Sequence, residues 1–152
     1  MAQEPDTAQL FELFNEIGII NQLASNRFER ALPEGLTTAQ FSVLNHFVRL
    51  GGERSPKRLA GAFQVTKGAM TNTLSKLEKK GLIRVVPDPT DGRAKVVSIT
   101  PEGVALRHRA IAEATRAMAD LQSVVSSEQA QAMLPALREI RAYLDEHRDS
   151  RA

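Results

Sequence analysis

The sequence predicts a mainly α-helical chain with one small β-hairpin. Apolar residues recur at three- and four-residue spacing along most of it, helix-capping residues stand ahead of these segments, and two short β-branched runs flank one loop rich in Pro, Asp and Gly. The 152 residues, 42% hydrophobic and 25% charged, suffice for one compact domain with long helical arms. We therefore expect a folded globular protein and treat residues 1–152 as a single domain.

The N-terminal segment carries the apolar stripe of a long amphipathic helix. Its apolar residues follow helical spacing from Leu10 to Ala31, and Asp6 with Gln9 suits a capping box. We place this helix at residues 7–32. At 1.5 Å per residue it would be ~39 Å long, more than a small domain needs to cover its own core. Part of its apolar surface must therefore pack elsewhere.

Three shorter helices are expected next. After the break at 33–35, Thr37 and Gln40 form a second capping signature, and the helix ends near Gly51. The residues expected on its buried face are Phe41, Leu44, Phe47 and Val48. The dipeptide Ser55-Pro56 begins a short helix that ends near Ala62, with Leu59 and Ala60 turned inward. After a turn at 63–65, Thr66 caps a helix that reaches Lys80.

The last third is predicted to form a hairpin and two more helices. The runs 84–86 and 95–99 are expected to be two strands joined by a protruding loop, because the segment between them is too long for a two-residue turn. Thr100-Pro101 begins a helix expected to extend to about Val125. Ser126 and Gln129 then cap a final helix that runs to roughly Arg148, in which Pro135 should introduce a kink or split off the first turn.

Two short helices joined by a tight turn and followed by a hairpin describe a winged helix-turn-helix, here over residues 37–100. In such a fold the second helix enters the major groove of DNA, and the hairpin tip, the wing, reaches along the backbone or into the minor groove. The inner face of the second helix is predicted to carry Met70, Thr73, Leu74 and Leu77, with Glu78 nearer this buried edge. Its outer face, which we name the recognition face, carries no Asp or Glu and consists of Gly68, Thr71, Asn72, Ser75, Lys76 and Lys79.

The charge is unevenly divided along the chain. Residues 55–100 carry 9 Lys/Arg and 3 Asp/Glu, a net +6, whereas residues 1–54 and 101–152 carry net charges of −3 and −1. A cationic block of this kind is suited to binding a polyanion such as nucleic acid. Phosphates neutralised by Lys and Arg release their counterions, and this release contributes to affinity. Charge alone fits a solvated basic surface equally well. The prediction of nucleic-acid binding depends on the cationic block lying in the same segment as the helix-turn-helix.

Side-chain chemistry assigns roles to individual residues. Asn can pair with the N6 and N7 atoms of adenine, whereas the lysines suit phosphates or guanine. The wing arginine, Arg93, suits a narrow minor groove, where the potential is most negative, and Asp91 is the candidate to orient its guanidinium. The predicted DNA contacts are Lys57, Lys67, Gly68, Thr71, Asn72, Ser75, Lys76, Lys79, Arg93 and Lys95, with Asp88 and Asp91 as wing support.

Several of these segments together resemble the MarR family of bacterial transcriptional regulators. The segments that carry the resemblance are 59–60, 65–71, 77–83 (Leu-Glu-Lys-Lys-Gly-Leu-Ile), 88–93 (Asp-Pro-Thr-Asp-Gly-Arg) and 99–103. The resemblance implies a homodimer with two winged domains on one DNA face and, often, a small ligand between the dimerisation and DNA-binding parts. It places the family's recognition contacts on Lys67, Gly68, Thr71, Asn72 and Lys76, and its wing arginine on Arg93. Family members often have Arg where Asn72 stands, which concerns the choice of operator rather than DNA binding.

The long terminal helices predict a homodimer independently of any family. The first helix and the segments 101–148 carry more apolar surface than a small winged domain can cover, so we expect it to be buried between subunits. Two recognition helices about 34 Å apart would then read half-sites ~10 bp apart in a near-palindrome. The predicted architecture is therefore a winged helix-turn-helix between N- and C-terminal dimerisation helices.

Other functions are less well supported by the residues. No nucleophile stands near a base, so an enzyme is not expected, and zero Cys excludes a thiol-based peroxide sensor. A metal-responsive regulator would need His46, His108 and His147 to converge, and a winged-helix protein-interaction module should lack a basic recognition face. A crevice lined by Ile20, Phe41 and Phe47 could accept an aromatic acid, although core packing explains these residues as well. We expect no cofactor, no metal, no membrane partner and a cytoplasmic location, and the effector site is unknown.

Overall fold

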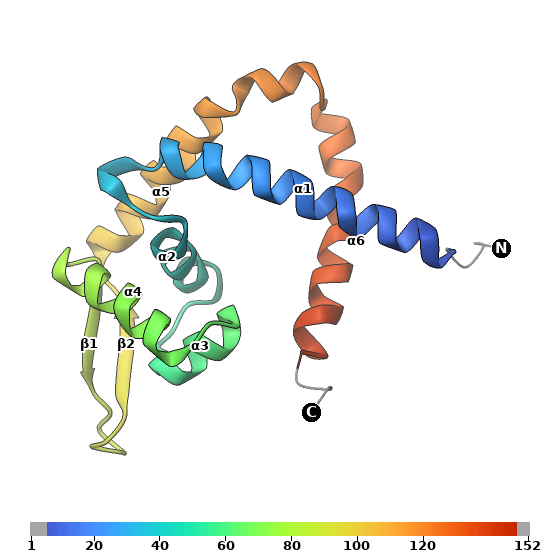
Figure 1. Ribbon diagram of the computed structural model, residues 1–152. Helices are drawn as coiled ribbons and strands as arrows, with labels where there is room; N and C mark the ends of the chain where they lie inside the picture. Colours follow the sequence, from blue (N-terminus) through green and yellow to red (C-terminus); the bar gives the residue numbers. More distant parts are fainter. Residues whose placement is uncertain (1–5, 149–152) are drawn as a thin grey trace. The chain divides into compact units, whose positions relative to one another are not determined.

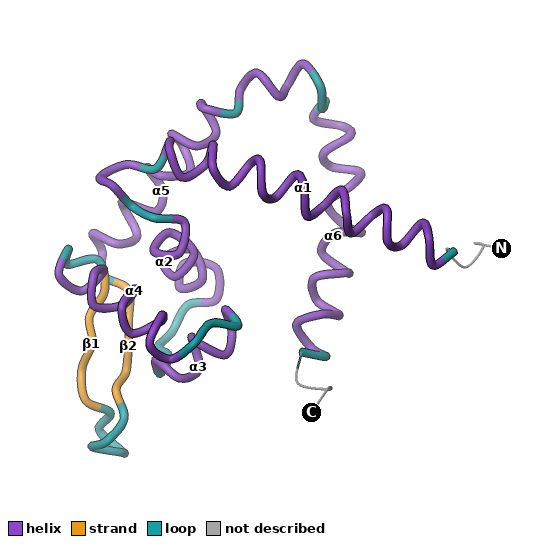
Figure 2. The backbone as a smooth tube through the Cα atoms, viewed as in Figure 1, coloured by secondary structure: helices purple, strands orange, loops and turns teal. Residues whose placement is uncertain are grey.

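A computed structural model describes residues 6–148, and in this range the chain is mainly helical with one two-stranded antiparallel hairpin (Figures 1 and 2). This confirms the predicted fold class. The chain divides after Ala117 into two compact units. In chain order the elements are α1 (Thr7–Ala31), the 3₁₀ turn η1 (Pro33–Gly35), α2 (Thr38–Leu50), α3 (Pro56–Phe63), α4 (Lys67–Lys79), β1 (Ile83–Pro87), β2 (Lys95–Ile99), α5 (Pro101–Ala117), the 3₁₀ turn η2 (Ala119–Ser123) and α6 (Ser127–Glu146).

The core of the first unit lies among α2, α3, α4, α5 and the hairpin. Its most deeply buried large side chains are Phe47, Leu36, Leu44, Leu59, Leu77, Val43 and Val97. On α2 the buried face is centred closer to Val43 than the sequence suggests, and Phe41 and Val48 are only half-buried. Phe41 instead packs edge-on against Phe28 of α1, with ring centroids 4.9 Å apart, and so seals the rim of the core rather than filling its centre.

The start of α2 follows the sequence prediction in detail. Thr37 Oγ1 accepts a hydrogen bond from the Gln40 backbone N–H, and the Gln40 side chain accepts one from the Thr37 N–H, which completes a capping box. Glu29, near the end of α1, adds a further acceptor, because its carboxylate receives hydrogen bonds from the Thr38 N–H (2.8 Å) and hydroxyl (2.5 Å). α1 itself begins differently: Asp6 accepts from the Ala8 N–H at 3.5 Å, without the expected contribution of Gln9.

The hairpin is anchored to the helices at its base and protrudes beyond α4 at its tip (Figure 1). β1 and β2 pair from Ile83↔Ile99 to Pro87↔Lys95, and Val97 is fully buried. Arg54 adds a single antiparallel bridge to Val97, with hydrogen bonds of 3.0 and 2.8 Å between their backbones. The wing is therefore held along the edge of β2 that β1 leaves open.

The C-terminal third departs from the sequence prediction. α5 ends at Ala117 rather than near Val125, and η2 follows as a separate 3₁₀ turn. The intervening residues include Asp, Ser and two adjacent valines, all weaker helix formers than Ala or Leu. The Ser126–Gln129 capping box then forms as expected. α6 is one helix with Pro135 inside it, so of the two predicted alternatives, a kink or a split first turn, the split is wrong.

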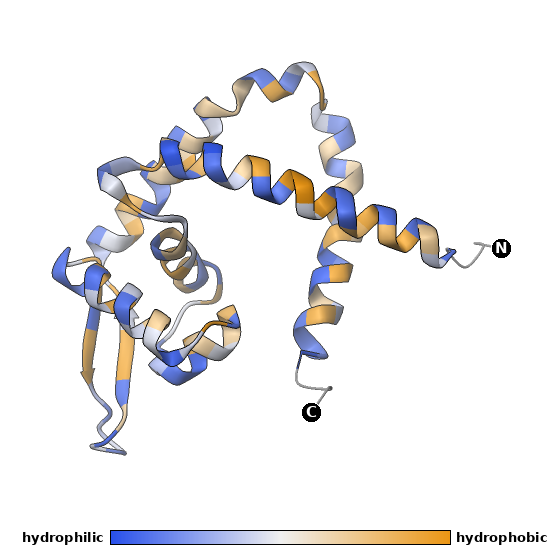
Figure 3. Ribbon diagram, viewed as in Figure 1, coloured by the Kyte–Doolittle hydropathy of each residue, from blue (hydrophilic) through white to orange (hydrophobic). Residues whose placement is uncertain are grey.

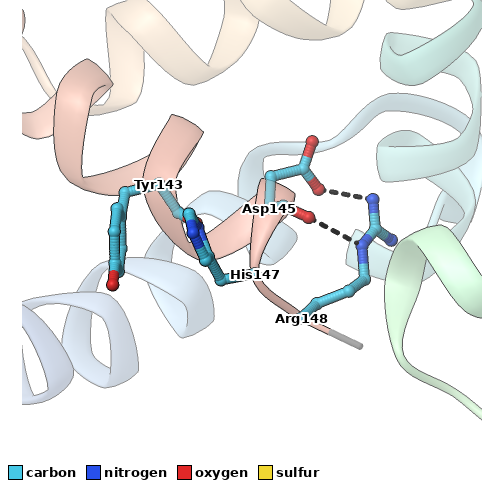
Figure 4. A network of polar contacts seen from close by, with 4 residues as sticks. All are labelled: Tyr143, Asp145, His147 and Arg148. Carbon is cyan, nitrogen blue, oxygen red and sulfur yellow. Dashed lines mark hydrogen bonds and ion pairs between the residues drawn. The ribbon is translucent and has the colours of Figure 1, made fainter. Parts of the chain in front are cut away.

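The end of α6 carries a small group of polar and aromatic contacts (Figure 4). The ring of His147 stacks on that of Tyr143, with centroids 4.2 Å apart, and its Nδ1 lies 2.9 Å from the Tyr143 carbonyl oxygen. Arg148 pairs with the Asp145 carboxylate at 2.5 Å. These contacts satisfy the last turn of the helix. None of the helices in the described residues is both long and apolar enough to cross a membrane.

Candidate nucleic-acid interface

The helix-turn-helix is built from two capped helices and a tight turn. Ser55 caps α3 by accepting from the Arg58 N–H at 3.1 Å, and Thr66 caps α4 by accepting from the Ala69 N–H at 3.1 Å. Between them Gln64 adopts a left-handed backbone conformation (φ 52°), which reverses the chain in a few residues. Leu59 of α3 and Leu77 of α4 are both fully buried. The orientation of α4 is thus fixed by a short turn and a packed interior.

α4 has the two faces that the sequence predicts. Met70, Leu74 and Leu77 are buried, whereas Thr73 is half-buried. Every residue of the recognition face is exposed. Glu78, expected nearer the buried edge, is also exposed and lies on the flank of this face. The exposed outer surface of α4 is therefore polar and cationic, with its one carboxylate to the side.

Two threonines of α4 have internal hydrogen-bond partners. The Thr71 hydroxyl donates to the Lys67 carbonyl oxygen at 2.8 Å, and the Thr73 hydroxyl donates to the Ala69 carbonyl oxygen at 3.1 Å. Such bonds to the preceding turn are common for Thr within helices. In this conformation Thr71 has no hydroxyl hydrogen left to give to a ligand, and it presents its oxygen lone pair and its methyl group.

The candidate DNA contacts outside α4 are also accessible. Lys57 lies exposed in the first turn of α3, and Lys67 is exposed in the first turn of α4. Arg93 and Lys95 are exposed at the tip and on the β2 side of the wing. All the residues proposed from the sequence to touch DNA thus belong to one cationic stretch made of α3, α4 and the hairpin.

The wing loop is shaped by its two carboxylates. Asp88 accepts hydrogen bonds from the Thr90 N–H and hydroxyl, both at 2.8 Å, and these bonds lower the pKa of the Asp88 carboxyl. Asp91 accepts a hydrogen bond from the backbone N–H of Arg93 at 3.0 Å, which fixes the Arg93 backbone, and its role in orienting the Arg93 guanidinium stays a prediction. A backbone bond from the Asp88 N–H to the Ala94 carbonyl oxygen closes the loop.

One set of contacts at the end of α4 gave no sign in the sequence. The Lys80 ammonium donates to the Glu34 carbonyl oxygen at 3.2 Å, and the Glu34 carboxylate pairs with Arg109 of α5. Glu34 has a left-handed backbone conformation (φ 56°) within η1. Because these partners are 46 and 75 residues apart, no local pattern could have revealed them. Lys80 is thereby committed to the scaffold, unlike Lys76 and Lys79.

Within the described residues of a single chain, the side chains considered for a metal or an effector lie in different environments. No cluster of three or more His, Asp or Glu there could hold a metal ion. His46 is half-buried with its ring centroid 5.3 Å from that of Phe63. Of the three side chains suggested for a crevice, Phe47 is buried in the core, Phe41 is half-buried and Ile20 is 60% exposed on α1.

Comparison with known proteins identifies the family. A model described as the MarR family matches residues 34–94, the segment that holds α2, α3, α4 and most of the hairpin. The multiple antibiotic resistance protein MarR of Salmonella typhimurium is 35% identical over 103 residues, which cover 62% of this chain and 71% of that protein. The chain belongs to the MarR family.

Solved structures share the fold of this MarR-family protein. The transcriptional regulator BldR from Sulfolobus solfataricus is 27% identical, with a TM-score of 0.76 and coverage of 92% of this chain and 99% of that one. A single-residue mutant of MarR from Escherichia coli, crystallised in complex with operator DNA, is 24% identical, with a TM-score of 0.68 and coverage of 90% and 99%. The family is one of transcriptional regulators, which agrees with the expectation that the chain is not an enzyme.

Proposed function

We propose that this MarR-family protein is a sequence-specific, double-stranded DNA-binding transcriptional regulator that binds a near-palindromic operator as a homodimer. The observation that carries the proposal is the recognition face of α4, whose residues are all exposed and include no carboxylate. A winged-helix module that bound only proteins would have no need of this cationic face. The operator-bound structure of a MarR protein from Escherichia coli, which has the same fold, supports the proposal.

In the proposed complex α4 lies in the major groove. Asn72 would pair with the N6 and N7 atoms of an adenine, because a side-chain amide offers one donor and one acceptor in the matching geometry. Lys67, Lys76 and Lys79 would bind phosphates or guanine, and the phosphate contacts are largely independent of sequence. A Cβ atom added at Gly68 would have no neighbour within 4 Å, so DNA backbone can approach α4 closely there.

The proposed wing contact is made by Arg93. The hydrogen bonds of Asp88 and Asp91 hold the loop in one shape, so the exposed Arg93 side chain extends from a fixed backbone. An arginine in the minor groove is favoured where that groove is narrow, as in A·T-rich DNA. Lys57 and Lys95 would add phosphate contacts on either side.

The proposed homodimer would cover apolar surface on α1 and on α6. Neither helix has a buried residue, and residues of high hydropathy recur along each of them (Figure 3). On α1 the side chains of Phe11, Ile20 and Leu23 are 70%, 60% and 68% exposed. So many exposed large apolar residues are unusual on a monomer and common at subunit interfaces.

Repression is the mode of regulation that we propose. A dimer that occupies a promoter prevents other proteins from binding the same DNA, so no activation surface is needed. A small molecule that binds better to a DNA-incompetent state of the dimer would release it, since a ligand shifts an equilibrium only by its differential affinity. Transcription from a promoter carrying the operator should then fall as protein is added.

Binding selection from a random duplex library, with the full chain, tests the proposal. We expect enrichment of an inverted repeat with half-sites ~10 bp apart, affinity that falls steeply with salt, and a dimer in sedimentation velocity. A monomer that enriches no sequence would contradict it. Enrichment of a single unrepeated site would leave DNA binding intact and exclude the two-fold mode.

A further inference from the structure

The exposed apolar side chains of the helix-turn-helix include one beside α4. Val65 stands between α3 and α4, immediately before the capping residue Thr66, and 43% of it is exposed. Single exposed apolar residues are common on protein surfaces, so the position of Val65 at the start of α4, rather than its exposure alone, decides what it can contact.

The turn itself accounts for the backbone of Val65 and for part of its side chain. The Gln64 N–H bonds to the Gly61 carbonyl oxygen and the Val65 N–H to the Ala60 carbonyl oxygen, which is the pattern of a Schellman motif at the end of α3. A residue before a helix cap also commonly packs on the fourth residue of the helix, here Met70, which is buried. The two backbone bonds fix the backbone at Val65, and 43% of the residue remains exposed.

Apart from the exposed side chains of Gln64 and Lys67, the surface next to Val65 is small and poor in side-chain hydrogen-bond donors. Gly68 has no side chain, the exposed Ala69 has only a methyl group, and the Thr71 hydroxyl hydrogen is used by the Lys67 carbonyl oxygen. The donors and cations of the recognition face begin at Asn72 and continue through Lys76 and Lys79. The N-terminal part of α4 therefore offers small apolar contacts beside the ammonium group of Lys67, and its remainder offers polar ones.

Major-groove chemistry provides one matching partner for an exposed methyl surface. Among the four bases only thymine presents a methyl group there, at C5. The N-terminal residues of a recognition helix are also those that reach base edges, and the cations that flank Val65 suit the surrounding phosphates. We propose that Val65 is a specificity-determining residue that packs against the 5-methyl group of a thymine in each half-site.

This inference rests on the proposed function, since Val65 reaches a base only if α4 enters the major groove. The test uses the duplex selected by the full chain, with each thymine of a half-site replaced in turn by deoxyuridine, which lacks only the methyl group. We expect one position at which deoxyuridine weakens binding about fourfold, the ratio that corresponds to one buried methyl group. Fluorescence anisotropy at fixed salt measures the ratio.

Variants assign that ratio to Val65. Val65→Ala should bind the thymine and deoxyuridine duplexes with nearly equal affinity, whereas Val86→Ala, which truncates an exposed valine on the wing strand β1, should keep the wild-type ratio. Thermal unfolding checks that each variant folds. If Val65→Ala does not fold, Val65→Thr, which keeps the branched shape and replaces one methyl group with a hydroxyl, should still lower the ratio.

The two proposals fail in different ways. Three results would overturn the role of Val65 and leave sequence-specific binding in place. The selected half-sites could contain no thymine, no deoxyuridine substitution could change the affinity, or the Val65→Ala protein could retain the wild-type ratio. A library from which the wild-type protein enriches no sequence would overturn the proposed function and the role of Val65 together.

Discussion

Gly103 in the first turn of α5 packs against the junction of α4 and the hairpin. A Cβ atom there would overlap the carbonyl oxygen of Leu82 and stand 2.8 Å from Cγ1 of Ile99. Because the nearest obstacle is backbone, it cannot move aside as a flexible side chain does. We predict that Gly103→Ala lowers the free energy of unfolding by roughly 2 kcal/mol, despite the higher helix propensity of Ala. Urea unfolding measures the change.

Gly68→Ala is the matched control for this prediction. Gly68 is also helical, but an added Cβ atom meets nothing within 4 Å. The same substitution should therefore raise the free energy of unfolding by about 0.5–1 kcal/mol through helix propensity alone. If the two variants unfolded at the same urea concentration, the close contact at Gly103 would be irrelevant to stability.

Asn72 and Lys79 both lie on the recognition face, yet their substitutions should have different effects. Removing a base-reading amide costs about 1–3 kcal/mol on the preferred duplex only, whereas removing a phosphate contact weakens binding to every duplex and reduces the salt dependence. We therefore expect Asn72→Ala to reduce the ratio of operator affinity to random-DNA affinity, and Lys79→Ala to preserve this ratio. Equal losses on both duplexes for Asn72→Ala would exclude base reading by this residue.

The contribution of the wing to DNA affinity should depend on the DNA sequence that flanks the half-sites. Arg93→Ala is expected to lower affinity most when the flanks are A·T-rich, because narrow minor grooves attract an inserted guanidinium most strongly. Titration of operators with A·T-rich and G·C-rich flanks measures the difference. Asp91→Ala keeps the guanidinium but removes the acceptor of the Arg93 N–H, so it should reduce the same flank preference in part. If Arg93→Ala lowered the affinity equally for both kinds of flank, Arg93 would bind phosphates rather than a narrow minor groove.

The junction of α1 and α2 predicts a specific pH dependence. The Thr38 hydroxyl and N–H hold the pKa of the Glu29 carboxyl below its ordinary value of 4.5. A carboxyl whose pKa is depressed on folding stabilises the fold above its unfolded-state pKa, and this contribution is lost as the pH falls through the folded-state pKa. Glu29→Gln should therefore be less stable than wild type at neutral pH, with the difference shrinking below pH 4.5. A constant difference across that range in thermal unfolding would argue against this linkage.

The elements could be predicted where their signals are local. The capping boxes at Thr37 and Ser126 and the cap at Thr66 lie within four residues of their partners, and the helix starts were accordingly placed correctly. The end of α5 was misplaced because no Gly or Pro marks it, only a gradual loss of helix propensity. The extent of the hairpin was well predicted from its β-branched runs and turn residues.

At the scale of the whole molecule, the contacts that join distant segments were beyond sequence reasoning. The bond from Lys80 to the Glu34 carbonyl oxygen and the close approach of Gly103 to Leu82 depend on the packed fold, not on spacing along the chain. The recognition face could be predicted because helical periodicity alone separates it from the core. The internal bond of Thr71, which changes what that residue can offer a base, required the structure.

Dimerisation is the property of the whole molecule on which the proposed operator geometry depends. Ile20 lies on the apolar stripe of α1 and is 60% exposed in a single chain, whereas Gln22 lies two residues further, on the opposite side of the helix. A carboxylate at position 20 would have to be buried without a partner in a dimer, so Ile20→Glu should shift the protein to monomer in sedimentation velocity. Gln22→Glu adds the same charge and should remain a dimer.

DNA binding provides the second measurement for this pair of variants. A dimer binds its second half-site as an intramolecular step, and loss of this linkage should lower operator affinity on the order of 100-fold. Ile20→Glu should show that loss with an unchanged far-ultraviolet circular dichroism spectrum, because Ile20 is 60% exposed in a single chain and does not belong to the core of the winged domain. If Ile20→Glu remained dimeric with wild-type operator affinity, the α1 stripe would not be the subunit interface, and the spacing of the two recognition helices would need another explanation.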